Sequence, residues 1–167
     1  MTELPRGIAV FDIDGVLADV RHRLHHVERR PKDWDAFFAA MDDDGPLVEG
    51  IELARRYAAE GHRIAYLTGR NESYRELTLA WLRRHGLPEG RLVMRRDDDR
   101  RPARLFKPQA LSRLARDGEI VTVVDDDRAV VDVLRHEGWP VLLAQWLHAD
   151  EEQQGSLFDA QEVEGRA

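Results

Sequence analysis

The feature that most constrains the fold is a repeated alternation of short apolar runs with longer amphipathic stretches. The runs are rich in β-branched residues, which predicts buried strands at residues 8–13, 63–67, 92–94, 120–124 and 140–144. Helical patterns fill the intervals at residues 50–60, 72–85, 108–116 and 128–137. Strands that alternate with helices of this length predict βαβ units. We therefore expect an α/β, Rossmann-like parallel sheet of about five strands flanked by helices.

Two segments depart from this alternation. Residues 19–45 contain the basic stretch RHRLHHVERRPK and then an amphipathic helix candidate, DWDAFFAAM, which predicts a small inserted cap segment after the first strand. Residues 150–167 are polar and acidic, which predicts a disordered tail. We expect one domain over residues 1–149, with the insertion at about 19–45.

Composition excludes several classes of protein. The absence of cysteine excludes disulfides, thiolate metal sites and thiol nucleophiles. Because no apolar run approaches about 18 residues and no targeting signal precedes the first strand, we expect a cytoplasmic protein without a membrane span. A net charge of −7 disfavours a wide basic surface that coats nucleic acid, although an enzyme that binds only a strand end remains compatible with it.

Oxygen-bearing side chains follow three of the five predicted strands. In a parallel sheet, ligands bind beyond the carboxyl ends of the strands. Those ends carry Asp12 and Asp14, then Thr68 with Gly69 and Arg70, then Asp125 and Asp126. Their convergence on one edge of the sheet predicts a site for an anion and a metal.

The motif FDIDGVLAD places two carboxylates on the same face of an extended strand. Asp12 could attack phosphorus as a nucleophile while Asp14 donates a proton to the leaving oxygen and later takes one from water. Gly15 would let the chain bend tightly away. The alternative interpretation is that both aspartates end a strand and accept hydrogen bonds from turn amides.

Thr68 and Lys107 are candidates for binding a phosphoryl group. In YLTGR, Thr68 would sit between a strand and a helix, where a hydroxyl and helix amides bind phosphate and Arg70 adds a forked cation. Lys107 would open the helix after the third strand and neutralise both Asp12 and a phosphoryl oxygen. Thr68 could instead be only a helix N-cap, and Lys107 a solvated surface residue.

The chain has three aspartate triplets, at residues 42–44, 97–99 and 125–127. Only the last follows a β-branched apolar run, so it alone is expected beside Asp12. Carboxylates are the ligands that Mg²⁺ prefers, and a cation would help an anionic Asp12 approach an anionic phosphate. We interpret the first triplet as a turn and the second as a solvated loop, both ordinary surface.

With these residues in order, the chain resembles the haloacid dehalogenase superfamily over roughly residues 8–144. The resemblance rests on FDIDGVL, the threonine of YLTGR, Lys107 and VVDDD. It implies that Asp12 forms an aspartyl-phosphate, that Asp14 is the general acid and base, and that Thr68 and Lys107 hold the phosphoryl group. It also implies Mg²⁺ bound by Asp12, Asp14, Asp125 and Asp126, with Asp127 a substitute for either of the last two.

More narrowly, the chain is similar to the 3′-phosphatase domain of phage polynucleotide kinase-phosphatases. The likeness lies in Arg23 nine residues after Asp14, in TGR, and in the runs WLRRHG, LVMRRDDDRRPARLFK and VVDVLRHEG. It implies that Arg23, Gly69 and Arg70 bind substrate. One departure is Ala103, where that group usually has an aspartate four residues before the motif lysine.

The resemblance implies a magnesium-dependent phosphomonoester hydrolase, a polynucleotide 3′-phosphatase of nucleic acid repair whose substrate is a phosphorylated nucleic-acid end or nucleotide. The short insertion favours a large or open-ended substrate. The alternatives are a nucleotidase or other small-metabolite phosphatase, and a catalytically inactive magnesium-binding interaction module. We expect Arg23 and Arg70 to bind substrate phosphate from the rim, with basic neighbours that follow a strand or simply form a solvated face: Arg21, His22, His25, His26, Arg29 and Arg30.

One short motif lies in the tail. Residues Gln154 to Phe158, QGSLF, resemble the peptides by which bacterial repair proteins dock on the DNA sliding clamp. Leu157 and Phe158 would then fill an apolar pocket of the clamp. The alternative is that the two side chains pack back onto the domain as a terminal latch.

Overall fold

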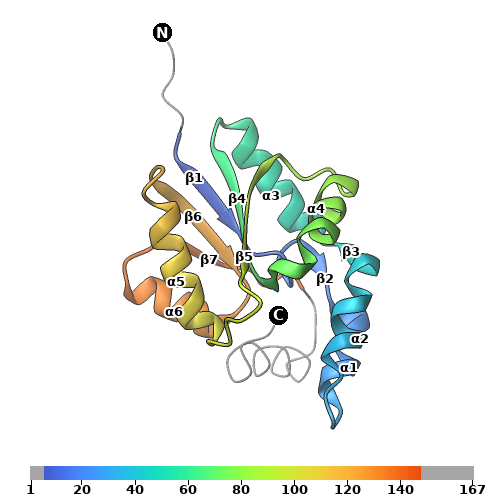
Figure 1. Ribbon diagram of the computed structural model, residues 1–167. Coiled ribbons are helices and arrows are strands. Elements are labelled where there is room, and N and C mark those ends of the chain that lie inside the picture. Colours follow the sequence, from blue (N-terminus) through green and yellow to red (C-terminus); the bar gives the residue numbers. More distant parts are fainter. Residues whose placement is uncertain (1–5, 148–167) are drawn as a thin grey trace.

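The computed structural model describes residues 6–147 and has a parallel sheet at its centre (Figure 1). All four strand pairs in this sheet are parallel, in the order β5-β4-β1-β6-β7. The strands are β1 (Ile8–Phe11), β4 (Arg63–Asn71), β5 (Gly90–Arg95), β6 (Ile120–Asp125) and β7 (Val141–Leu143). The predicted α/β, Rossmann-like sheet of five strands is therefore confirmed.

Helices cover both faces of the sheet, because side chains along each strand alternate between the faces. Ala9 and Phe11 of β1 pack in one core with α3 (Val48–Ala59) and α4 (Arg75–Arg84). Ile8 and Val10 point the other way and pack in a second core with α5 (Ala103–Leu114) and α6 (Arg128–His136). Both faces of β1 are thus buried, which explains its uninterrupted apolar sequence.

The segment expected as an insertion forms a cap on a two-stranded antiparallel stem, β2 (Ala18–Asp19) and β3 (Gly45–Pro46). Between these strands the chain forms η1 (Arg21–Arg23), α1 (His25–Glu28), α2 (Trp34–Ala39) and η2 (Ala40–Asp43). The cap has a small core of its own: Val20, Leu24, Val27, Trp34, Phe37, Phe38 and Met41. In Figure 1 the cap projects from the sheet as the blue and cyan helices α1 and α2.

Two predicted helix starts differ from the structure by three residues or more. The helix expected at 108–116 begins at Ala103 and carries Pro108 in its interior, because the burial of Phe106, Leu111 and Leu114 favours a longer helix. The helix expected from residue 72 begins as α4 only at Arg75, after η3 (Glu72–Tyr74), because β4 continues to Asn71.

Within residues 6–147, no helix is both long and apolar enough to cross a bilayer. The expected tail, including Gln154 to Phe158, lies outside the described residues.

Candidate active site

The carboxyl ends of the central strands bring the predicted acidic residues together. Asp12 directly follows β1, and its backbone amide donates to the carbonyl of Val124 in β6 at 2.9 Å. Asp125 ends β6 and Asp126 follows it. Oxygens of these three aspartates lie within 4.8 Å of one another, and all three side chains are buried.

The group formed by Asp12, Asp125, Asp126 and Lys107 has the properties of a divalent-cation site. Lys107 Nζ lies 3.0 Å from Asp12 Oδ2 and 2.6 Å from Asp125 Oδ2. With every group ionised, two negative charges remain in excess. Neither oxygen of the buried Asp126 has a hydrogen-bond partner among the described residues, which is costly for a carboxylate unless a cation binds it. The all-oxygen donor set fits Mg²⁺.

The same crowding shifts the ionisation of these residues in the metal-free protein. Burial raises the pKa of Asp12 to about 8; the ammonium of Lys107 opposes this rise, and repulsion by Asp125 adds to it. Burial also raises the pKa of Asp126 well above its usual value. Burial would lower the pKa of Lys107, but Asp12 and Asp125 raise it above its ordinary value, so the lysine stays charged.

Gly15 makes room for the carboxylate of Asp126. Its φ of +79° lies in the left-handed region, as the tight bend after β1 requires. A Cβ atom on Gly15 would lie 1.9 Å from Asp126 Oδ2, so any side chain here would displace that carboxylate. The glycine of the DIDG motif is therefore required both by its backbone conformation and by the space beside it.

The third aspartate of the VVDDD motif has a different role. Asp127 is the N-cap of α6, and its side chain accepts hydrogen bonds from the amides of Ala129 at 2.9 Å and Val130 at 3.4 Å. Of the three aspartates in this motif, Asp125 and Asp126 therefore lie in the carboxylate group, and Asp127 is the N-cap of α6.

Asp14 lies outside this carboxylate group, although the sequence-based set of metal ligands included it. Its Oδ1 accepts hydrogen bonds from Arg23 Nη2 at 3.0 Å and from Arg70, by Nε at 3.0 Å and Nη2 at 2.6 Å. Burial alone would raise the pKa of Asp14, but the charges of Arg70 and Arg23 outweigh it and lower that pKa below its usual value. Asp14 Oδ2 has no hydrogen-bond partner within residues 6–147.

The predicted placement of Arg23 and Arg70 at the rim is wrong, since both side chains are fully buried. They are buried because they pair with two carboxylates, Asp14 and Asp44. The prediction that the first aspartate triplet is ordinary surface is therefore wrong for Asp44, which is 2% exposed. Sequence reasoning missed Asp44 because its neighbours Gly45 and Pro46 indicated an exposed turn.

Thr68 and Gly69 lie within β4, and no helix begins beside them. The expected helix start beside Thr68 is therefore wrong. The Thr68 hydroxyl instead accepts the backbone amide of Arg70 at 3.2 Å, and the Gly69 carbonyl accepts Arg95 Nε at 3.1 Å. Arg95 is fully buried behind the site, with its guanidinium 4.8 Å from the ring centre of Phe106, and sequence reasoning did not find it.

Lys107 lies in the second turn of α5 and does not open that helix. It still reaches Asp12, as predicted. Ala103, one helical turn before Lys107, is buried and offers no carboxylate, so Asp12 and Asp125 alone form the ion pairs of this ammonium among the described residues.

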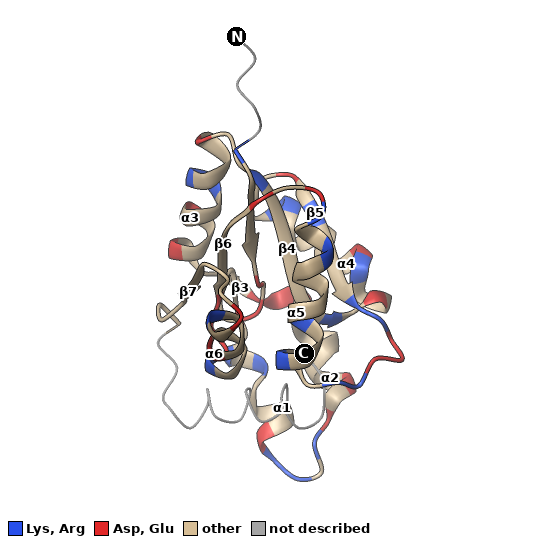
Figure 2. Cartoon of the chain, turned by 90° about the vertical axis from the view of Figure 1, so that its left-hand side faces the viewer, with Lys and Arg blue, Asp and Glu red and all other residues tan. Residues whose placement is uncertain are grey.

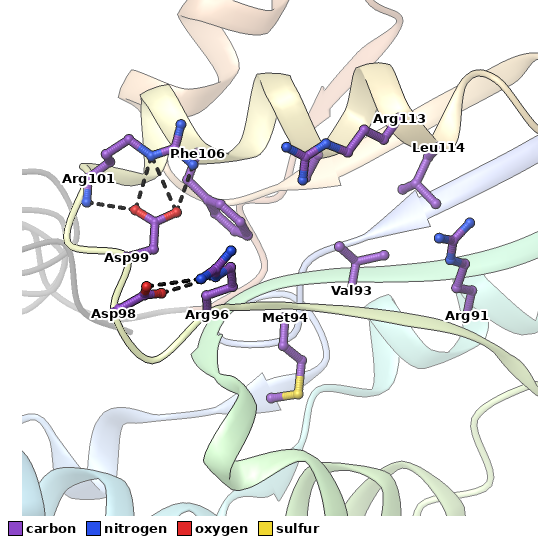
Figure 3. A pocket seen from close by; sticks show the side chains of 11 residues that line it. Arg91, Val93, Met94, Arg96, Asp98, Asp99, Arg101, Phe106, Arg113 and Leu114 are labelled. Atoms are coloured by element: carbon purple, nitrogen blue, oxygen red, sulfur yellow. Dashed lines mark hydrogen bonds and ion pairs between the residues drawn. The ribbon is translucent and has the colours of Figure 1, made fainter.

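Two surface hollows contain none of the residues of the carboxylate group, Asp12, Asp125 and Asp126. One, of about 460 Å³, lies beside the edge strand β5 and α5, and Figure 3 shows two of its arginines paired with aspartates: Arg96 with Asp98 at 3.0 Å and Arg101 with Asp99 at 2.7 Å. Asp97 and Asp98 are exposed, as predicted for the second triplet. This hollow contains none of the predicted site residues.

The second hollow, of about 590 Å³, lies at the tip of the cap. Its lining contains basic, acidic and apolar side chains: Arg29, Arg30, Lys32, Asp33, Asp35, Pro31 and Trp34. Figure 2 shows the basic side of this loop in blue between α1 and α2. Arg29 and Arg30 are exposed, so the cap offers positive charge to solvent in a chain whose net charge is −7.

Comparison with known proteins gives one family match over most of the chain. The family model described as polynucleotide kinase PNKP phosphatase domain matches residues 6–146. Among curated proteins, membrane-associated phosphatidylinositol transfer protein 3 from Mus musculus and from Homo sapiens is 29% identical over 93 residues, or 54% of this chain. The chain spans only 8% of the length of these relatives.

Solved structures share the fold. A chain of the Pnkp1/Rnl/Hen1 complex aligns with a TM-score of 0.70 and 23% identity, over 83% of this chain and 45% of its own. The class C acid phosphatase from Bacillus anthracis with tungstate bound aligns with a TM-score of 0.64 and 14% identity, over 95% of this chain and 80% of its own.

Proposed function

The chain belongs to the family of polynucleotide kinase PNKP phosphatase domains, and from this membership we propose that it is a magnesium-dependent phosphomonoester hydrolase acting on the 3′-phosphate of a nucleic-acid end. The observation that carries the proposal is the buried group of Asp12, Asp125, Asp126 and Lys107 beside Asp14, one oxygen of which has no hydrogen-bond partner among the described residues. An intact set of this kind favours a working enzyme over an inactive magnesium-binding module.

In the first half of the reaction, Asp12 attacks the phosphorus atom and the bond to the leaving oxygen breaks, which leaves an aspartyl-phosphate. Asp14 gives its proton to the leaving oxygen through Oδ2, the oxygen that the arginines do not occupy. The two guanidiniums favour the ionised form of Asp14, whereas the negative charge of an incoming phosphate favours its protonation.

In the second half, Asp14 accepts a proton from water, the water oxygen bonds to phosphorus, and the bond to Asp12 breaks to release phosphate. Lys107 and Thr68 would hold the phosphoryl group, while Asp12, Asp125 and Asp126 would bind Mg²⁺. When bound, Mg²⁺ neutralises negative charge between the nucleophile and phosphate. Arg23 and Arg70, buried beside Asp14, would bind the substrate phosphate, and Gly69 would bind it through its backbone.

The substrate assignment rests on the cap. The cap between β2 and β3 comprises only residues 20–44, too few to enclose a substrate as a large cap domain does, and its tip carries Arg29, Arg30 and Lys32. A short cap with exposed arginines at its tip suits a polyanion that is longer than the phosphate group itself. One similar solved structure is that of the Pnkp1/Rnl/Hen1 RNA repair complex, which also supports a nucleic-acid end as substrate.

The test is phosphate release with and without Mg²⁺ from three substrates: a 3′-phosphorylated oligonucleotide, the same oligonucleotide phosphorylated at its 5′ end, and a panel of mononucleotides. We expect the 3′-phosphorylated oligonucleotide to give the highest kcat/KM, and EDTA to abolish its hydrolysis. Faster turnover of a mononucleotide would support a nucleotidase. No release from any phosphate monoester would contradict the proposed enzyme.

A further inference from the structure

The structure contains a carboxylate that neither the family motifs nor the catalytic scheme uses. Asp44 directly precedes β3, at the point where the chain returns from the cap. Its side chain is wholly shielded from solvent, whereas its neighbours in the same triplet, Asp42 and Asp43, are exposed. A buried aspartate needs polar or charged partners that offset the free energy lost on desolvation, and those partners indicate its role.

Both oxygens of Asp44 accept hydrogen bonds from the arginines that hold Asp14. Arg23 forms a two-point contact, with Nε 2.7 Å from Asp44 Oδ1 and Nη2 2.9 Å from Oδ2. Arg70 Nη2 lies 3.1 Å from Asp44 Oδ2. The Nη2 atoms of both arginines therefore bridge the two carboxylates, at 3.0 Å and 2.6 Å from Asp14 Oδ1.

The two arginines and two aspartates form a charge-balanced group of buried side chains. Two guanidiniums meet two carboxylates, and all four side chains are buried. Without Asp44, two buried cations would share Asp14 as their only carboxylate within the described residues, and their mutual repulsion would pull them from Oδ1. Asp14 would then be free to rotate, and its free oxygen would lose a fixed direction.

Asp44 is itself held from two sides. Its backbone carbonyl accepts Trp81 Nε1 of α4 at 2.8 Å, and its backbone amide donates to the carbonyl of Met41 in the cap at 3.1 Å. The carboxylate is also 2.7 Å from His22 Nε2 of the cap. Asp44 thus connects the cap and a helix of the core to the two arginines behind the site.

We propose that Asp44 is a positioning residue for the reaction, which rests on the proposed phosphatase function. It fixes Arg23 and Arg70 on one oxygen of Asp14, so that the other oxygen faces the leaving group. Asp44 does not touch substrate and acts only through the two arginines.

The proposal predicts a loss that depends on the leaving group. In Asp44→Asn the shape is kept and one negative charge is removed. We expect kcat for a 3′-phosphorylated oligonucleotide to fall about 100-fold, the scale of a misplaced catalytic group, with KM changed less than about threefold. For p-nitrophenyl phosphate, whose leaving group needs little protonation, we expect a loss below about tenfold. Asp14→Asn should show the same dependence with larger losses.

The matched control is Asp43→Asn, which removes the same charge from the exposed neighbour and should leave both substrates unaffected. If Asp44→Asn does not fold, as judged by its melting curve, Asp44→Glu keeps the charge balance while its longer side chain shifts the guanidiniums, and the same dependence is expected.

Equal losses for both substrates would overturn the role of Asp44, because a residue needed only for folding lowers the two activities by one common factor. Equal losses can be measured only if the wild-type enzyme hydrolyses both substrates, so this outcome would not contradict the proposed function. Failure of the wild-type enzyme to hydrolyse either substrate would overturn the proposed function and this role together.

Discussion

Asp12 and Asp14 lie two residues apart at the end of one strand, yet their carboxylates are held by different cations. Asp12 Oδ2 faces Lys107 Nζ at 3.0 Å, whereas Asp14 Oδ1 faces Arg70 Nη2 at 2.6 Å. Burial raises the pKa of Asp12 to about 8, while Arg70 and Arg23 lower that of Asp14 despite its burial. In the metal-free protein this order is the reverse of that expected for a nucleophile and an acid. A divalent cation bound beside Asp12 would lower its pKa, and the negative charge of an incoming phosphate would raise the pKa of Asp14.

Asp12→Asn should abolish turnover and leave stability almost unchanged. The substitution removes the nucleophile, so we expect phosphate release to fall by roughly 10⁴-fold or more. The backbone amide of Ile13 donates to Asp12 Oδ1 at 2.8 Å, and an asparagine oxygen can keep this bond. Urea unfolding should therefore change by less than about 1 kcal/mol. Asp132→Asn, an exposed substitution on α6, is the control. Retention of more than a few per cent of wild-type activity on an aryl phosphate would exclude the covalent mechanism.

Gly15→Ala should inactivate the enzyme through Asp126. Both Gly15 and Gly138 have a positive φ, at +79° and +87°, so alanine at either position should cost about 1–2 kcal/mol of stability. A Cβ atom at Gly15 would meet Asp126 Oδ2, whereas at Gly138 it would meet nothing within 4 Å. Turnover and the Mg²⁺ concentration at half activity should therefore change in Gly15→Ala alone. Similar kinetics in the two variants would show that Asp126 is not needed where the structure places it.

Removal of divalent cations should make stability fall as the pH rises. The pKa of Asp12 is about 8 in the folded protein against 3.8 for an ordinary aspartate, so between these values the folded protein binds more protons than the unfolded chain. Asp126, whose pKa is also raised, contributes in the same direction. In EDTA we expect the stability of Asp126→Asn to depend less on pH than that of wild type. The melting temperature of wild type minus that of Asp126→Asn should be lower at pH 8 than at pH 5.5 by more than about 3 °C.

Burial lowers the pKa of His26 and of His85, so these histidines make stability rise with pH, opposite to the effect of the carboxylates. Because both proteins contain the two histidines, the comparison with Asp126→Asn isolates the effect of the carboxylates. Mg²⁺ should raise the melting temperature of wild type more at pH 8 than at pH 5.5. A parallel pH dependence in wild type and variant would contradict the raised pKa of Asp126.

The basic tip of the cap should matter for a long substrate and not for a short one. We expect the triple alanine variant of Arg29, Arg30 and Lys32 to raise KM for a 3′-phosphorylated oligonucleotide several-fold. The KM of this variant should also depend less on salt. The slope of log KM against log salt concentration should decrease by about 0.7 for each single-strand phosphate that these side chains neutralise in wild type. KM for a mononucleotide should stay unchanged.

A second triple variant removes the same charge elsewhere. Arg56, Arg116 and Arg135 are exposed and lie on or just after the core helices α3, α5 and α6. Their replacement by alanine should leave the salt dependence as in wild type. Equal effects of the two triple variants would indicate that net charge, and not the cap, attracts the substrate.

The sequence by itself determined the parallel sheet and the edge of that sheet at which the acidic residues meet. Alternation of buried runs with helices forces parallel strands, and parallel strands place their carboxyl ends at one edge. Asp12, Asp125 and Asp126 could therefore be predicted to meet from strand ends alone, although Asp12 precedes the other two by more than 100 residues in the chain. The helix start at Ala103 was not predictable, because Pro108 is a strong local signal that burial of the surrounding side chains overrides.

Only the tertiary structure decided which charges are paired. Asp14, Arg23, Asp44 and Arg70 come from four segments, and no local pattern distinguishes Asp44 from the exposed Asp42 and Asp43. Periodicity depends on contacts between near neighbours in sequence, so it can be read along the chain. The energy of a buried charge depends on the distance to its counter-charge and on the exclusion of water, and both are set only when distant segments pack together.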